Sequence, residues 1–351
     1  MSHSCGERCK QGSSRSRSGL VAELSGGRKC PVAEPIVMFI YYIIVLIYAM
    51  ASEESGYLTS LYSNWSERMA ADPEMDLTPL REMFETWHLA TAEPEGVTYA
   101  EVDAGGVPAM WCVPEDCAED RVLVYCHGGG YVVGSMHATR KLAGHLAKAA
   151  GTRALVVEYR RAPEHPHPAP VEDAVTAYRW LLDEGVRPEH IATTGESAGG
   201  NLCTTMALEL RDVGDPLPAA IMPISPWTDM ELTGDSLDRN ASTDTLVQRG
   251  LVEVMRNLFL GDSSPTDPLA NPLYADLTGL PPMLIHASEH EALLDDTRRL
   301  AARAEDAGVD VTVHLEPEMQ HAYPYLAGRA PEADRAVERI GEWVRPKLGL
   351  A

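Results

Sequence analysis

Short apolar runs and longer amphipathic stretches alternate along the chain and predict its strands and helices. Runs rich in apolar and β-branched residues predict strands at 121–126, 191–194, 282–285 and 311–315. Apolar positions at helical spacing predict helices over 198–211 and about 293–307, and amphipathic stretches lie at 57–68, 78–88 and 245–260. The strand that ends at residue 194 and the helix that begins at 198 leave Ser197 at a strand-to-helix turn.

Ser197 lies in the sequence Gly195-Glu196-Ser197-Ala198-Gly199-Gly200, which fits the G-x-S-x-G pattern of a nucleophile elbow. In such an elbow, a sharp turn exposes the serine hydroxyl above the sheet edge, with a helix N-terminus behind it. Glycine at 195 and 199 allows a strained backbone and close packing of the helix on the strand. A bare G-x-S-x-G pattern often occurs by chance, but the flanking strand and helix favour the functional interpretation.

Three consecutive glycines, Gly128, Gly129 and Gly130, follow the predicted strand 121–126. The backbone N–H groups of such a loop can turn toward a developing negative charge, as in an oxyanion hole. We expect Gly128 and Gly129, with Gly130 as a further candidate, to share this role with the N–H of Ala198. A flexible glycine-rich loop is the alternative, and the serine elbow downstream argues against it.

A serine hydroxyl needs a general base, which in this architecture follows the nucleophile along the chain. The histidines after Ser197 are His286, His290, His314 and His321. His286 ends a strand-like run and His314 alternates onto a strand face, whereas His321 follows that strand in the loop 316–324. A catalytic imidazole is expected in such a loop, so we assign the general base to His321.

The carboxylate that orients the base is expected after the strand 282–285, where four acidic residues compete. These residues are Glu289, Glu291, Asp295 and Asp296. Asp295 and Asp296 fall in the first turn of the predicted helix, where capping and stabilisation of the helix dipole are their ordinary roles. Glu291 lies closest to the strand end without entering the helix, so we choose it as the acid.

Further motifs accompany these residues in the same order along the chain. They are HGGGY at 127–131, YRRAPEHP at 159–166, GESAGG at 195–200, SPWTD at 225–229, DPL at 267–269 and PLY at 272–274. With the regions of Glu291 and His321, they resemble the bacterial esterases of the hormone-sensitive-lipase-like branch of the α/β-hydrolases, over about residues 52–349. The resemblance implies an α/β-hydrolase fold for 51–351: a mostly parallel central sheet flanked by helices, with a helical cap from about 52–90 and 226–279.

The resemblance also implies a function, namely a serine carboxylesterase that acts on short- to medium-chain esters, lactones or acetyl esters without a cofactor. In the D-P-L-x-D motif of this family the first acid serves the histidine, and that frame again assigns Glu291. This chain departs from the family in having Glu rather than Asp at 291 and at 196. Both changes keep a carboxylate, so they leave the mechanism standing.

Two alternative functions remain open. Amide deacetylation would use the same groups as ester hydrolysis. A non-catalytic small-molecule binding protein on this fold would be expected to lack the serine or the histidine, and this chain retains both Ser197 and His321.

The amphipathic stretch 245–260 has apolar residues at helical spacing, which either pack as ordinary core or line the substrate pocket. They are Leu246, Leu251, Val254, Met255 and Leu258.

Charge and cysteine content narrow the choice of partners. The net charge of −23 argues against nucleic acid or an anionic membrane surface and favours neutral esters over anionic ones. The seven cysteines are scattered without metal-ligand pairs, and we expect reduced thiols. His286 and His290 are four positions apart, a spacing that would place two metal ligands on one face of a helix. These two residues lie on either side of a predicted strand end rather than on a helix, so no metal is expected. A homodimer is left open.

Residues 1–50 differ from the rest: a basic, Ser/Gly-rich segment predicted to be disordered precedes the apolar run 36–51. Sixteen helical residues span roughly 24 Å, which is marginal for a hydrocarbon core of about 30 Å. The run fits a signal peptide, a membrane anchor, or a non-native upstream extension before a start at Met50. We expect a cytoplasmic protein unless this run is native, in which case it is anchored or exported.

Overall fold

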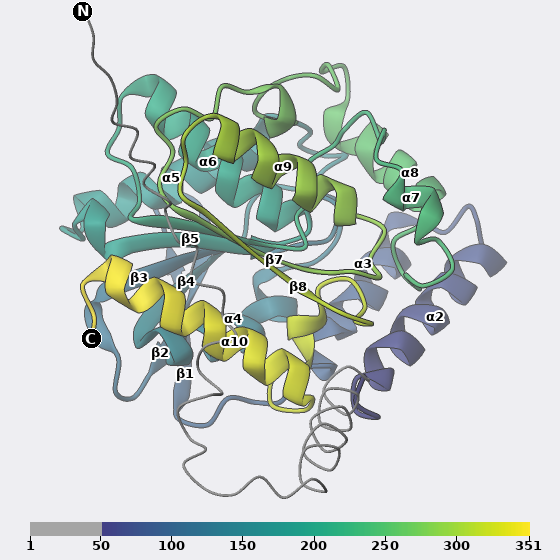
Figure 1. Cartoon of the computed structure of the whole chain (residues 1–351), viewed down its shortest axis with the longest axis horizontal. Coiled ribbons are helices and arrows are strands. Elements are labelled where there is room, and N and C mark those ends of the chain that lie inside the picture. Colours follow the sequence, from purple (N-terminus) through teal and green to yellow (C-terminus); the bar gives the residue numbers. More distant parts are fainter. Residues whose placement is uncertain (1–50) are drawn as a thin grey trace, which may run out of the picture. The chain divides into compact units, whose positions relative to one another are not determined.

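An eight-stranded sheet forms the centre of the computed structural model, which describes residues 51–351 (Figure 1). The strands are β1 (Val97–Asp103), β2 (Pro108–Pro114), β3 (Ala118–Cys126), β4 (Thr152–Val157), β5 (Ile191–Glu196), β6 (Ala220–Ile224), β7 (Met283–Ser288) and β8 (Val311–Glu316). Their order is β1-β2-β4-β3-β5-β6-β7-β8. Only the pairs β1/β2 and β2/β4 are antiparallel, so the predicted mostly parallel sheet is confirmed.

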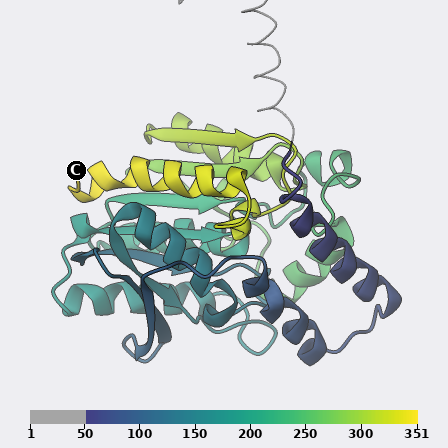
Figure 2. The same cartoon turned by 90° about the horizontal axis from the view of Figure 1, so that it is seen from below.

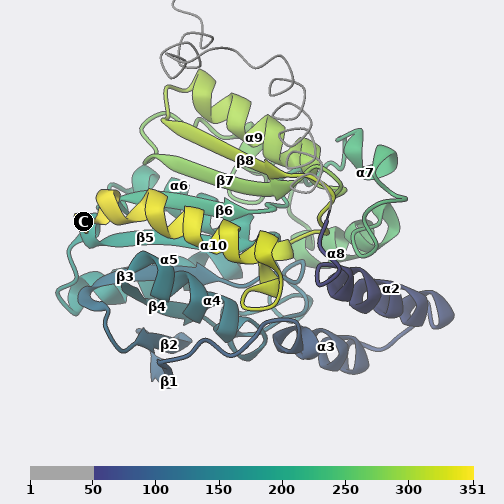
Figure 3. The ribbon, with the colours of Figure 1, turned by 60° about the horizontal axis from the view of Figure 1, so that its bottom comes forward.

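Helices cover both faces of this sheet, as the turned view shows (Figure 3). On one face α4 (Met136–Ala150) packs against α10 (Pro331–Val344). On the other lie α5 (Ala169–Asp183), α6 (Ala198–Val213) and α9 (Leu294–Asp306). Because parallel strands need long crossover connections, the helices between them are carried onto the sheet faces, as an α/β-hydrolase fold requires.

Local sequence explains where one of these covering helices begins and ends. The Ser135 hydroxyl accepts hydrogen bonds from the N–H groups of His137 and Ala138, at 3.2 and 3.1 Å, and so caps α4. Gly151 ends this helix with a φ of 69°, a left-handed conformation that glycine adopts without strain. The buried face of α4 then lies against β2 and β4.

Helices gather at one end of the sheet (Figure 2), next to the ends of β5 and β7, which are labelled in Figure 3. They are α2 (Gly56–Ala71), α3 (Leu77–Glu85), α7 (Ser236–Arg239) and α8 (Arg249–Leu260), and we call them the cap helices. Elsewhere along the described chain, short 3-10 helices lie at Thr86–Leu89, Pro188–His190, Pro272–Tyr274, Tyr323–Leu326 and Arg345–Leu348. Helices α2 and α3 pack through buried aromatic rings, with Trp65 of α2 and Phe84 of α3 at 4.7 Å between ring centroids.

The amphipathic stretch 245–260 is helical only from Arg249 onward. Its first residues form a turn instead, because the carboxylate of Asp244 accepts hydrogen bonds from the N–H groups of Leu246 and Val247. The predictions for residues 1–50, a basic disordered segment with a signal, anchor or extension, lie outside the described residues. From 51 to 351, none of the helices is long and apolar enough to cross a membrane.

Candidate active site

Ser197 occupies a sharp turn between β5 and α6, as the sequence predicts. Its backbone has φ 56° and ψ −119°, a strained conformation for a residue with a side chain. Hydrogen bonds from Ser197 N–H to Ile224 O (2.9 Å) and from Trp227 N–H to Ser197 O (3.0 Å) hold the turn against the β6 end. The strain is therefore paid for by contacts with the neighbouring strand and raises the hydroxyl above the sheet.

Gly199 gives the helix room to approach the sheet at this turn. A Cβ atom at this position would lie 1.9 Å from the backbone oxygen of Cys126 on β3, a distance that backbone cannot relieve. We expect Gly199→Ala to lower the free energy of unfolding by about 1–3 kcal/mol or more, because an overpacked site forces backbone shifts. Urea unfolding of the purified variant measures this loss.

Gly250→Ala is the matched control, because a Cβ at Gly250 on α8 meets nothing within 4 Å. This control is expected to keep or slightly raise the stability, since alanine favours helix over glycine by up to about 1 kcal/mol. Equal stabilities of the two variants would contradict the close-packing role of Gly199.

The glycine loop after β3 presents two free N–H groups beside Ser197. Gly129 and Gly130 have φ values of 107° and 60°, which favour glycine, and both line the same pocket as Ser197. Within residues 51–351, no acceptor bonds the N–H groups of Gly129, Gly130 or Ala198. These three N–H groups are thus available to an anion at the serine.

Gly128 does not share this arrangement, which corrects the expectation for it. Its N–H donates to the Glu196 Oε1 atom at 2.6 Å, so it is already used inside the protein. The same carboxylate accepts hydrogen bonds from the hydroxyls of Tyr125 and Tyr325, at 2.5 and 2.6 Å. Glu196, noted in the sequence only as a departure from Asp, therefore fastens the glycine loop to the end of β5, directly before Ser197.

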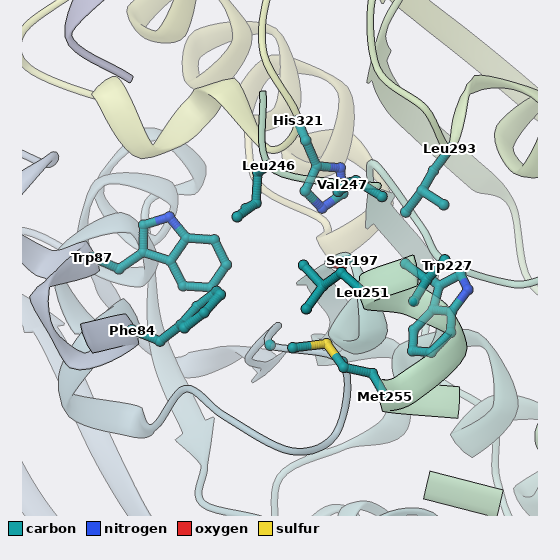
Figure 4. Close-up of a pocket in the computed structure, with 13 residues that line it drawn as sticks. Phe84, Trp87, Ser197, Trp227, Leu246, Val247, Leu251, Met255, Leu293 and His321 are labelled. Atoms are coloured by element: carbon teal, nitrogen blue, oxygen red, sulfur yellow. The ribbon is translucent and has the colours of Figure 1, made fainter. Parts of the chain in front are cut away.

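His321 lies in the loop between β8 and the 3-10 helix Tyr323–Leu326, and it lines the pocket with Ser197 (Figure 4). Its ring is buried, and its backbone oxygen accepts a hydrogen bond of 3.1 Å from the Tyr62 hydroxyl on α2. Trp87 donates its indole N–H to that hydroxyl at 3.0 Å. The cap helix α2 thus fixes the histidine loop from above.

Glu291 reaches the same histidine from the loop between β7 and α9. Its Oε2 atom lies 3.8 Å from His321 Nδ1 and accepts a 2.6 Å hydrogen bond from the Ser225 hydroxyl. Among the described residues, Glu291 Oε1 and His321 Nδ1 are both buried without a hydrogen-bond partner. Catalytic hydrogen bonds are often long in the absence of substrate, so a separation of 3.8 Å is compatible with a functional pair.

The charges around His321 favour its protonated form. Burial lowers the pKa of His321, but the charge of the nearby Glu291 carboxylate outweighs it, with help from Asp244 and Glu196. The result is a pKa above the ordinary value of 6.5. A buried imidazole in this setting can accept a proton from a neighbouring hydroxyl and hold the resulting charge.

Asp295 and Asp296 point elsewhere, and neither caps its own helix as their position had suggested. The Asp295 carboxylate accepts from Ser236 N–H at 2.9 Å and pairs with Arg239 at 3.0 Å. Asp296 accepts from the N–H groups of Thr228 and Asp229 at 2.7 and 2.8 Å. Both tie α9 to the segment after β6, because that segment packs beside the helix start.

An apolar pocket opens above Ser197 (Figure 4). In addition to Ser197, His321 and the two glycines, its walls are Phe84, Trp87, Trp227, Leu246, Val247, Leu251, Val252, Met255 and Leu293. Of the stretch 245–260, Leu246, Leu251 and Met255 thus reach the pocket, whereas Val254 is 58 % exposed. The stretch contributes both to pocket and to surface.

The roles of several residues of this site are not evident from the sequence: Tyr62, Ser225, Asp244, Gln320 and Tyr325. Each acts through a partner far away in the chain, as when the Ser225 hydroxyl donates to Glu291 and accepts from Ala322 N–H at 3.2 Å. For Ser225 the available signal is the motif SPWTD, which begins at this residue directly after the strand that adjoins β5. No local pattern marks the other four.

Known proteins are similar to this chain in sequence and in fold. Residues 123–325 match the family described as alpha/beta hydrolase fold. An acetyl-hydrolase of Streptomyces hygroscopicus is 39 % identical over 297 residues, which cover 80 % of this chain and 98 % of that protein. A carboxylesterase of Mycobacterium tuberculosis is 37 % identical over 228 residues, covering 62 % of this chain and 71 % of its own length.

The crystal structure of an esterase from the bacterial hormone-sensitive lipase family superposes with a TM-score of 0.82 and 42 % identity, over 86 % of this chain and all of that one. A second esterase/lipase structure, from an uncultured bacterium, gives 0.79 and 36 %, over 85 % of this chain and 100 % of its own. The chain belongs to the α/β-hydrolase family, in its hormone-sensitive-lipase-like branch, and is a carboxylic ester hydrolase.

Proposed function

We propose that this chain hydrolyses short- to medium-chain carboxylic esters through an acyl-enzyme on Ser197, with His321 as general base and Glu291 as the acid that orients it. One observation carries the proposal: a single apolar pocket is lined by Ser197, His321, Gly129 and Gly130. A strained serine, a buried imidazole beside a carboxylate, and free N–H groups are the parts that acyl transfer needs.

In the proposed reaction, Ser197 Oγ attacks the ester carbonyl carbon while His321 takes the hydroxyl proton. The carbonyl oxygen becomes an oxyanion, which the N–H groups of Gly129, Gly130 and Ala198 stabilise. Glu291 stabilises the imidazolium, which then protonates the departing alkoxide. Water attacks the acyl-serine, again giving its proton to His321, and the carboxylic acid leaves as Ser197 recovers its hydrogen.

The pocket wall supports a limit on acyl length. Helices α3 and α8, with the turn before α8, contribute most of the apolar wall. The Met255 side chain closes the pocket over the glycine loop, since a Cβ at Gly130 would lie 2.2 Å from Met255 Sδ. Burying one methylene contributes about 0.8 kcal/mol, so kcat/KM should rise about fourfold per added carbon until the pocket is full. We expect the maximum at about four to eight acyl carbons.

A series of p-nitrophenyl esters tests this length limit. Met255→Ala is expected to move the maximum to longer chains, by about two carbons, because it removes the far part of an unbranched side chain. Val254→Ala on the same helix is the control, since Val254 faces away from the pocket. A wild-type preference for emulsified long-chain triacylglycerol, or an unchanged profile in Met255→Ala, would contradict the prediction.

The mechanism itself is tested with a fluorophosphonate probe, which reacts with activated serines. We expect one probe per chain, located at Ser197 by peptide mass spectrometry, and loss of ester hydrolysis in step with labelling. Labelling elsewhere, or none in a protein that hydrolyses esters, would reject Ser197 as the nucleophile. A folded protein that binds esters without turning them over would instead favour the non-catalytic alternative.

Amides are a second substrate class to include in the same assays. The relative from Streptomyces hygroscopicus is named an acetyl-hydrolase, and an acetyl group is the smallest acyl chain that this pocket would hold. The proposed groups would cleave an N-acetyl amide by the same steps, with His321 protonating the leaving amine. Comparing one acetyl ester with the matching N-acetyl amide decides between the two preferences.

A further inference from the structure

Asp244 is a buried acid of the cap that the mechanism so far leaves unused. It lies between α7 and α8 and is 1 % exposed. Its Oδ1 atom accepts hydrogen bonds from Leu246 N–H (3.0 Å) and Val247 N–H (2.8 Å). Its Oδ2 atom accepts from Ala292 N–H at 2.8 Å. Both oxygens of Asp244 therefore accept hydrogen bonds from backbone N–H groups, an arrangement that favours the ionised form of its carboxylate.

These three donors belong to two functional parts of the site. Leu246 and Val247 are pocket walls, whereas Ala292 is the residue directly after Glu291. The cap adds a second tie to this loop, because the Asn240 side chain donates to the backbone oxygens of Glu289 (3.0 Å) and Glu291 (2.8 Å). The cap segment 240–247 thus holds both the pocket wall and the loop of the proposed acid.

The residue before His321 fastens the same segment from the other side. Gln320 donates through Nε2 to Thr243 O at 2.8 Å, and its Oε1 atom accepts from the N–H and hydroxyl of Thr245, both at 2.9 Å. Gln320 is therefore hydrogen-bonded to Thr243 and Thr245, the residues directly before and after Asp244. This double contact keeps Asp244 beside the histidine loop.

We propose that Asp244 is a positioning residue of the triad, which fixes the Glu291 loop through Ala292 and supplies a second buried carboxylate to His321 from the cap. The inference rests on the proposed function of Ser197, Glu291 and His321. Its consequence is that part of the electrostatic support for the general base comes from the cap rather than from the sheet.

The ionisable groups around His321 come from four parts of the fold. They are Glu291 after β7, Asp244 in the cap, Glu196 at the end of β5 and the Tyr62 phenol on α2. Burial raises the pKa of Tyr62, which keeps the phenol neutral. Burial also raises the pKa of Asp244, while His321 and the N–H donors oppose that rise. Asp244, when ionised, is one of three carboxylates that raise the pKa of His321.

Asp244→Asn tests the proposal with two readouts on p-nitrophenyl butyrate. The Asn oxygen can still accept from Leu246 and Val247, whereas its NH₂ group faces Ala292 N–H and loses that bond. We expect kcat to fall about 10- to 100-fold, as for the loss of a hydrogen bond to a charged group, with a smaller change in KM. The acid limb of kcat/KM should also move to lower pH, by about 0.5 to 1 unit, because the imidazolium loses a stabilising charge.

Asp276→Asn is the matched control, because this exposed aspartate accepts from Thr278 N–H at 2.9 Å in a similar turn, beside Arg211 near the end of α6 and away from the pocket. It should leave kcat and the acid limb unchanged. Asp244→Ser is the second variant if Asn is poorly tolerated, since its hydroxyl can accept from the same turn without facing Ala292. Rates are given per fluorophosphonate-titrated site, so unfolded protein does not count.

A lower kcat together with a shifted acid limb in either Asp244 variant supports the proposal. Wild-type values in both variants overturn it, and so does a loss of kcat with an unmoved acid limb, which indicates a merely structural tie. Failure of the underlying function is distinguishable, because the wild-type protein would then show neither ester turnover nor labelling at Ser197.

Discussion

Replacing Ser197 by alanine is expected to lower kcat for a p-nitrophenyl ester by about 10⁴- to 10⁶-fold, the range that loss of a nucleophile in a catalytic triad produces. Alanine cannot form the acyl-enzyme, and the oxyanion N–H groups alone leave only a small residual rate. The same backbone turn is kept, because Ser197 N–H and O bond to Ile224 and Trp227 through the main chain. Stopped assays with purified protein measure the residual rate.

Ser60→Ala provides the control for this experiment, since Ser60 is an exposed serine on α2. It should hydrolyse esters at the wild-type rate. The Ser197→Ala protein should unfold at a similar urea concentration, which separates lost chemistry from lost structure. If the Ser197→Ala protein still shows substantial turnover after extensive purification, the proposed mechanism is contradicted.

Glu291→Gln is expected to lower kcat by about 10²- to 10⁴-fold, because it keeps the shape of the side chain but removes the charge that stabilises the His321 imidazolium. Gln can still accept the hydrogen bond from the Ser225 hydroxyl. Because Glu291 is the main cause of the raised pKa of His321, the acid limb of kcat/KM should also move to lower pH. The pH profile from about 5 to 9 covers this shift.

Asp295→Asn is the control for Glu291, because it lies four positions further along and faces Ser236 and Arg239 instead. Its partner Arg239 is half-exposed, so the loss of the ion pair should cost at most about 1 kcal/mol of stability, with kcat near the wild-type value. Melting temperature and turnover together decide the assignment. Catalytic collapse in Asp295→Asn beside a near-normal Glu291→Gln would reverse it.

Helix boundaries illustrate where sequence patterns reach their limit. The apolar spacing over 245–260 predicts one helix, yet α8 begins at Arg249. The carboxylate of Asp244 competes for the N–H groups that a helix would otherwise begin with, and Ala292 from a distant loop fixes that carboxylate. Periodicity describes which face is buried, but a contact with another segment decides where the first turn starts.

The glycine loop shows the same limit at the site. Three glycines in a row predict an anion-binding loop, but they do not say which N–H groups remain free. Glu196 takes the N–H of Gly128 because β3 and β5 pair in parallel, with Cys126 opposite Gly195. The free donors are therefore displaced by one residue, to Gly129 and Gly130.

The sequence alone determined the features that depend on neighbours along the chain. The turn at Ser197, the glycine loop after β3 and the loop that carries His321 are each set by a strand, a helix or glycines a few residues away. Only the tertiary structure decided how Glu291, Ser225, Asp244 and Gln320 meet around the histidine. Their contacts join segments tens of residues apart, such as Ser225 with Glu291 and Thr243 with Gln320. Such contacts follow from the packing of the cap on the sheet ends, for which no local pattern exists.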